Sequence, residues 1–82
     1  MNHFVYILQS LKDNRFYIGS TSDVAARLAF HNAGLQRSTK NRIPFRLVYV
    51  ECCNSKQVVL IRERQIKAYK GGAAFQRLLK GM

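Results

Sequence analysis

The sequence has 82 residues, 48% of them hydrophobic, and carries 14 Lys and Arg against 4 Asp and Glu, for a formal net charge of +10. This length favours one domain over residues 1–82, and the hydrophobic content excludes a disordered chain. Apolar runs are too short to span a membrane and no secretory signal is visible, so we expect a cytoplasmic protein. The charge favours nucleic acid as partner over an anionic membrane surface, because a basic stripe opposite bulky apolar residues is missing.

Two β-rich segments open the chain. Phe4–Leu8 and Arg15–Gly19 predict two strands, and Asp13–Asn14 between them favours a tight turn. If these two residues form the turn, Tyr17 lies opposite Ser10 in a hairpin.

A group of helix-capping residues, 20–23, comes next and predicts a helix from about Asp23 to Ala33. Val24 and Leu28 are four residues apart and should pack inward, and Gly34 should end the helix.

The second half of the chain begins with a polar, basic loop over residues 35–42. Phe45–Cys52 predicts a third strand, Lys56–Tyr69 a second helix capped by Asn54–Ser55, and Ala73–Leu79 a short last helix. The order β-β-α-β-α-α predicts an α+β fold, with helices packed on one small sheet.

Acidic residues are few, so each one is easy to judge. Asp13 is placed to satisfy backbone groups in the turn, and Asp23 suits a helix start. Glu51 lies at a strand end, and nothing in its surroundings marks it as a metal ligand. Glu63 falls in the middle of a helix and near its packed face. It either pairs with Lys67 at i+4 or supplies a carboxylate to a hard cation such as Mg²⁺.

Arg27 and His31 form a second pair of interest, because their spacing places them on one face of the first helix. We expect that face to differ from the core stripe of Val24 and Leu28. An arginine offers a planar donor fork for phosphate, and a histidine moves protons near neutral pH. The alternative is that both are solvated polar residues.

Tyr6 and Tyr17 should share one face of the predicted hairpin, where both phenols face one cleft. In the register given above they are offset by about 13 Å along the strands, a gap that strand twist or another register must close. The alternative is that both are core aromatic residues, which are common in strands.

The order of these features resembles the GIY-YIG nuclease family, and most of all its small single-domain bacterial members. The resemblance rests on Val5-Tyr6-Ile7, on Tyr17-Ile18-Gly19, on Arg27 with His31, and on Glu63, and it covers about residues 3–80. The first motif reads Phe4-Val5-Tyr6, so its glycine is absent while its tyrosine is kept.

The resemblance implies a three-stranded antiparallel sheet flanked by helices, and a metal-dependent endonuclease that hydrolyses DNA phosphodiester bonds with one Mg²⁺ or Mn²⁺ ion. It implies Tyr6, Tyr17, Arg27, His31 and Glu63 as catalytic residues, with Glu63 as the metal ligand. Related domains occur in repair, resolving and homing nucleases, so a link to DNA repair or recombination and to particular DNA structures is expected.

The mechanism that we expect is in-line attack by water. Arg27 stabilises the phosphorane, and Tyr6 or His31 takes the proton, a choice the sequence leaves open. Basic residues of the loop and second helix are expected to contact the phosphate backbone of DNA, or of RNA: Arg37, Lys40, Arg42, Lys67 and Lys70. The competing hypotheses are a nucleic-acid-binding module without catalysis and a domain that docks on a membrane or a protein.

Overall fold

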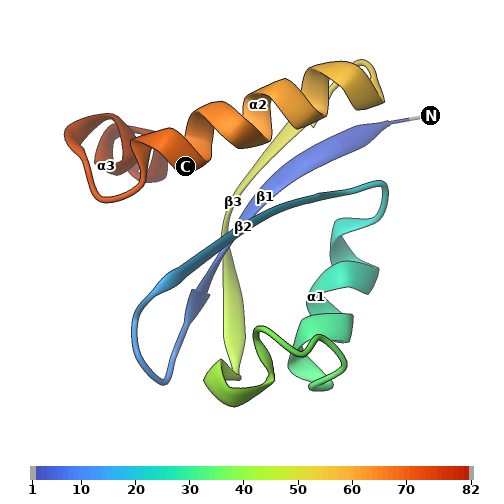
Figure 1. Ribbon diagram of the computed structural model, residues 1–82, viewed down its shortest axis with the longest axis vertical. Helices are drawn as coiled ribbons and strands as arrows, with labels where there is room; N and C mark the ends of the chain where they lie inside the picture. The colour runs from blue at the N-terminus through green and yellow to red at the C-terminus, as the bar shows by residue number, and fades with distance from the viewer. Residues whose placement is uncertain (1, 82) are drawn as a thin grey trace.

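The computed structural model of the protein describes residues 2–81, so Met1 and Met82 of the expected domain lie outside the described residues. Strands β1 (His3–Ser10), β2 (Phe16–Thr21) and β3 (Phe45–Cys53) form an antiparallel sheet in the order β2-β1-β3. Helices α1 (Val24–Asn32), α2 (Lys56–Tyr69) and α3 (Ala73–Lys80) flank it, and a 3-10 turn, η1 (Lys40–Arg42), precedes β3 (Figure 1). The predicted α+β fold and element order are confirmed.

The central strand β1 divides the interior into two clusters, because neighbouring side chains of a strand point to opposite faces. Val5 and Ile7 belong to a cluster with residues of α2 and α3, whereas Tyr6 and Leu8 belong to a cluster with residues of α1. Figure 1 shows α1 and α2 on opposite sides of the sheet. Each face of the sheet is therefore covered by different helices.

Both long helices begin at side-chain caps. Asp23 accepts a hydrogen bond from the Ala26 backbone N–H at 3.0 Å, and Ser55 accepts one from the Val58 N–H at 3.2 Å. The second helix has the predicted bounds. Within residues 2–81 no helix is long and apolar enough to cross a bilayer.

The predicted hairpin register is wrong. Tyr17 pairs with Leu8, not with Ser10, because residues 11–15 form a wider connection than a two-residue turn. The Ser10 hydroxyl accepts hydrogen bonds from the Lys12 and Asp13 N–H groups at 3.1 and 3.2 Å, which ends the strand early, and Asn14 takes a left-handed φ of 62°. The change moves Tyr17 two positions along β1, toward Tyr6.

Candidate active site

A phenol pair and an imidazole meet on the α1 face of the sheet. The Tyr6 hydroxyl lies 3.1 Å from Nε2 of His31. The ring centroids of Tyr6 and Tyr17 are 6.3 Å apart, and those of Tyr17 and His31 are 4.8 Å apart. Side chains from β1, β2 and α1 thus come into one cluster, and the corrected register closes the gap that the sequence left between the tyrosines.

The face assigned to His31 from the sequence is wrong. His31 is fully buried and lies three residues after Leu28, so it continues the packed stripe that starts at Val24. Arg27 is half-buried and its guanidinium lies 5.0 Å above the Phe30 ring. The helix therefore directs the imidazole inward and keeps the guanidinium within reach of solvent.

Hydrogen bonds on both ring nitrogens fix the His31 side chain. Nδ1 lies 2.9 Å from the Thr39 hydroxyl, which in turn lies 3.5 Å from the Gln36 carbonyl. If the Thr39 hydroxyl donates to that carbonyl, it accepts from Nδ1–H and leaves the Nε2 lone pair for the Tyr6 hydroxyl. Burial, and then the charge of Arg27, lower the pKa of His31 from its ordinary 6.5. The imidazole is therefore neutral at pH 7 and is a proton acceptor.

The pKa of the Tyr6 phenol is shifted by burial and by the groups around it. The phenol is 2% exposed, and burial raises its pKa well above the ordinary 10.0. The neighbouring Tyr17 raises this pKa further, Arg27 lowers it and Glu63 raises it. Arg27 of α1 and Glu63 of α2 thus have opposite electrostatic effects on the pKa of the same phenol.

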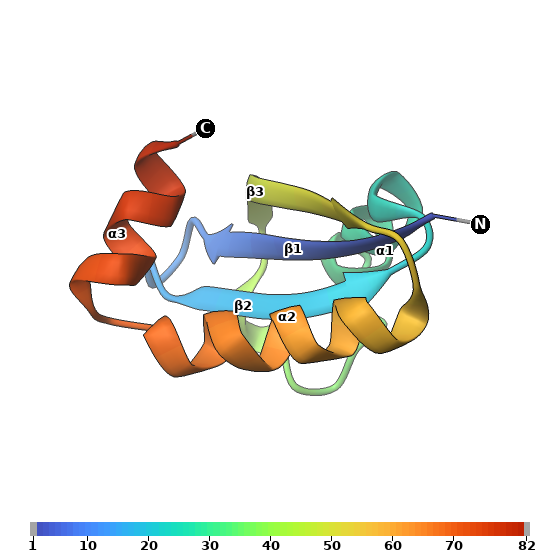
Figure 2. The same cartoon turned by 90° about the horizontal axis from the view of Figure 1, so that it is seen from above.

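Glu63 reaches this region from α2, which runs alongside the edge strand β2 (Figure 2). Its side chain is 18% exposed, and the Lys67 ammonium donates to Oε2 at 2.7 Å. The i+4 ion pair considered from the sequence is thus present.

The donor set can be compared with the needs of a divalent ion. Among residues 2–81 no three His, Cys, Asp or Glu side chains gather as a metal cage. Mg²⁺ commonly keeps several waters and takes one or two carboxylates plus oxygens of a substrate phosphate. A single accessible carboxylate such as Glu63 fits that mode and does not fit a closed all-protein site.

Each of the two charged groups lines an open hollow of its own. One of about 260 Å³ is lined by Arg27 and Thr21, and one of about 280 Å³ by Glu63 and Leu60. A third, of about 250 Å³, is lined by both Thr21 and Leu60. The three hollows are separate, and neighbouring ones share a single lining residue, Thr21 or Leu60. A larger hollow of about 560 Å³ lies between α1 and β3, but its lining is apolar and includes none of the predicted site residues.

Three contributors to the site were missed in the sequence. A Cβ atom on Gly19 would lie 2.6 Å from the Tyr6 hydroxyl oxygen, so only glycine leaves room for the phenol. Gln36 donates to the Tyr17 hydroxyl at 2.9 Å, and Thr39 holds His31. The third position of the Tyr17-Ile18-Gly19 motif was a signal for Gly19, whereas nothing local marks Gln36 and Thr39 within a polar loop.

The predicted phosphate contacts are spread over two segments. Arg37 and Lys40 have exposed side chains in the loop after α1. Arg42 forms an ion pair with Asp13 at 3.1 Å, and Lys70 donates to the Phe16 carbonyl at 2.9 Å. With Lys67 paired to Glu63, three of the five already have a partner in the protein.

Comparisons with known proteins agree with this geometry. A family model described as the GIY-YIG catalytic domain matches residues 2–72. A UPF0213 protein of Staphylococcus haemolyticus is 47% identical over 68 residues, which are 82% of each chain, and one of Haloquadratum walsbyi is 41% identical over 68 residues, 82% of this chain and 75% of that one. The solution NMR structure of a UPF0213 protein from Bacillus halodurans superposes with a TM-score of 0.60 at 36% identity, covering 98% of this chain and 84% of that one.

Proposed function

We propose, from the fact that this chain belongs to the GIY-YIG family, that it is a divalent-metal-dependent endonuclease that hydrolyses phosphodiester bonds in DNA. The family is one of endonucleases, and a nuclease domain implies a nucleic acid substrate. One observation supports the proposal: the Tyr6 hydroxyl lies 3.1 Å from Nε2 of His31, and the Tyr17 ring is close to both, so three of the five expected side chains meet in one cluster.

Proton transfer is assigned to the phenol and imidazole. The attacking water gives its proton to the Tyr6 oxygen while the phenol proton passes to Nε2 of His31. The lowered pKa of His31 keeps this nitrogen free to accept a proton at neutral pH. The sequence leaves the choice of base open, and in this scheme His31 is the final base and Tyr6 is the relay. Tyr17, held by Gln36, orients the water or the phosphate.

Two charged side chains, Arg27 and Glu63, are assigned to stabilise the charge that develops on the phosphate. The Arg27 guanidinium, which lines an open hollow, would stabilise the pentacoordinate phosphorane with a preorganised positive charge. Glu63 would hold the divalent ion, which when bound supplies Lewis-acid stabilisation of the leaving oxygen. Lys67 would compete with that ion for the Glu63 carboxylate, because its ammonium occupies Oε2.

The direct test is cleavage. Purified protein is incubated with supercoiled plasmid and with branched DNA, which probes the proposed link to repair and recombination, in Mg²⁺ or Mn²⁺. We expect nicking by the parent protein that Glu63→Ala abolishes while DNA retention survives. Binding without cleavage on either substrate and in either metal would contradict the enzyme and favour a binding module of the same fold.

A further inference from the structure

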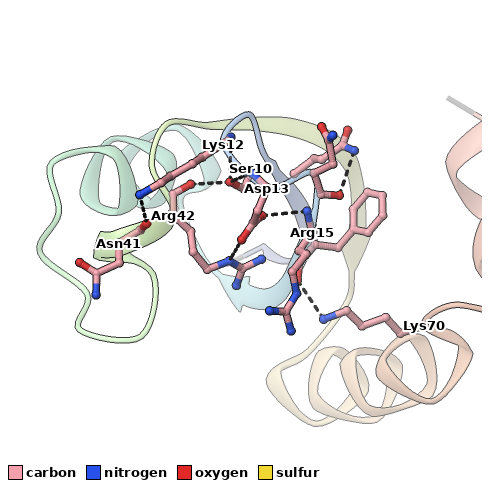
Figure 3. Close-up of polar contacts among 10 residues, drawn as sticks. Ser10, Lys12, Asp13, Arg15, Asn41, Arg42 and Lys70 are labelled. Atoms are coloured by element: carbon pink, nitrogen blue, oxygen red, sulfur yellow. Dashed lines mark hydrogen bonds and ion pairs between the residues drawn. The ribbon is translucent and has the colours of Figure 1, made fainter.

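Four basic side chains gather at the turn between β1 and β2: Lys12, Arg15, Arg42 and Lys70. We name them the hairpin-end cluster. Figure 3 shows that they come from different elements: Lys12 and Arg15 from the hairpin, Arg42 from the end of the η1 turn, and Lys70 from the end of α2. Residues far apart in the sequence thus place four positive charges in one small region.

The protein itself neutralises little of this charge. Arg42 Nε pairs with Asp13 at 3.1 Å, while Lys12 and Lys70 donate to the backbone carbonyls of Asn41 and Phe16 at 3.1 and 2.9 Å. Each ammonium carries three donors, so free donors remain on both lysines.

Two guanidinium groups have unmet hydrogen-bonding capacity. Among residues 2–81, the Arg15 guanidinium has no hydrogen bond or ion pair with a protein group, and Nη2 of Arg42 is buried without a partner. A buried donor without an acceptor is costly, so an incoming anion that reaches it is favoured.

The crowding is unfavourable for the protein alone. Burial lowers the pKa of Lys70, and the positive charges of Arg42, Arg15 and Lys67 lower it further. Like charges at this range repel one another unless an anion lies among them. Because the charges are spread along a surface, a chain of phosphates suits them better than one small anion.

We infer that the hairpin-end cluster binds backbone phosphates of a polynucleotide strand that continues past the scissile linkage. The position of that linkage rests on the proposed function. Lys70 lies seven residues beyond Glu63, which is about 10 Å along the helix, or about three nucleotide rises of a duplex. Lys67 lies between them, so α2 leads from the scissile site to the cluster.

The test is the salt dependence of binding to a short DNA duplex, measured by fluorescence anisotropy in Ca²⁺, a divalent ion chosen to limit cleavage during the measurement. The test variant is Arg15→Gln with Lys70→Gln. The matched control is Arg77→Gln with Lys80→Gln, which also removes one arginine and one lysine, from exposed positions in the last turn of α3. Arg15→Gln alone serves as a second variant, because Lys70 also holds the Phe16 carbonyl.

We expect the slope of log K against log salt to fall by roughly 0.9 for each lost phosphate contact, so by about 1.8 in the test pair and by less in the control. Equal slopes in the test pair, the control and the parent protein would overturn the inference, as would a parent protein that does not bind DNA. The proposed function can fail separately. If the parent protein never nicks DNA but shows the expected slopes, the nuclease activity is refuted while phosphate binding by the hairpin-end cluster is supported.

Discussion

The two faces of the sheet differ in chemistry although they share the strand β1. On the α2 and α3 face the buried cluster is apolar, with Ile7, Ile66 and Phe75 at its centre. On the α1 face, Tyr6 and His31 are almost as deeply buried but are tied together by hydrogen bonds. One face is therefore packed by apolar side chains alone, whereas the other holds polar groups in fixed positions, to which we assign the proposed chemistry.

Alternation along one strand links the two faces. Tyr6 lies between Val5 and Ile7, so the apolar cluster that fixes β1 also fixes the position of the phenol. An 82-residue chain buries only a limited surface on folding, so the same strand has to serve both the apolar core and the polar cluster. This distinction between the faces would be wrong if substitutions on the apolar face changed DNA cleavage without changing stability. It would also be wrong if substitutions on the polar face changed cleavage only by lowering stability.

The largest effect on stability is expected from Ile66→Ala. This side chain is fully buried in the apolar cluster, so its truncation should lower the free energy of unfolding by about 2–5 kcal/mol. Urea titration followed by circular dichroism measures it. Ile61→Ala is the control, because Ile61 lies on the same helix but is 51% exposed, and it should change stability by less than about 0.5 kcal/mol. Equal losses in the two variants would contradict the assignment of the core.

A smaller loss is expected from Gly19→Ala, with a larger effect on chemistry than on folding. The added Cβ would lie 2.6 Å from the Tyr6 oxygen and 2.8 Å from Cζ, so the ring must move and its hydrogen bond to His31 should break. Such overpacking costs roughly 1–3 kcal/mol, and nicking should fall in molecules that remain folded. Gly81→Ala is the control, since its Cβ would make ordinary contact at 3.4 Å. Unchanged nicking in Gly19→Ala would show that the phenol position is unimportant.

His31 should make stability depend on pH. Its pKa is lowered in the folded protein, so the unfolded chain binds more protons just below the ordinary pKa of 6.5. The stabilising contribution is therefore complete above about pH 6.5 and is lost as the pH falls toward the lowered value. Unfolding titrations of the parent and of His31→Gln at pH 7.5 and 5.5 should show a loss on acidification in the parent that the variant largely lacks. Asp13 and Glu51 also have lowered pKa values, but these carboxyl groups affect stability only in a more acidic range.

The smallest effect concerns Lys67→Met. Removal of the ammonium frees Oε2 of Glu63, so Mn²⁺ affinity measured by electron paramagnetic resonance should rise by a few fold. Stability should change by no more than a few tenths of a kcal/mol, as is usual for i, i+4 pairs. Weaker Mn²⁺ binding would mean that Lys67 supports the carboxylate and does not compete with the ion.

Local signals in the sequence predicted most of the fold. The caps at Asp23 and Ser55 set both helix starts, and the second helix ends at Tyr69 as expected. The hairpin register was missed because the Ser10 hydroxyl, a side-chain group, reorganises the turn. A tight-turn dipeptide does not reveal such a competing interaction.

The site was predicted in part. The identities of Tyr6, Tyr17, Arg27, His31 and Glu63 came from a resemblance, and their catalytic roles stay predictions. The burial of His31 follows from its place three residues after Leu28 and seven after Val24, a spacing that the sequence already contains. Its partners Tyr6 and Thr39 were missed, because they reach it from other parts of the chain. Long-range packing of this kind leaves no periodic pattern of its own.

The central claim is that neighbouring residues of β1 serve different ends, and the pair Tyr6→Phe and Ile7→Val tests it most directly. Each change should lower stability by about 1 kcal/mol, one by losing a hydrogen bond and the other by losing a methylene group. Single-turnover nicking of plasmid should fall by roughly 100-fold or more in Tyr6→Phe, as loss of a proton-transfer group predicts, and should be nearly unchanged in Ile7→Val. Equal nicking by the two variants would contradict the account.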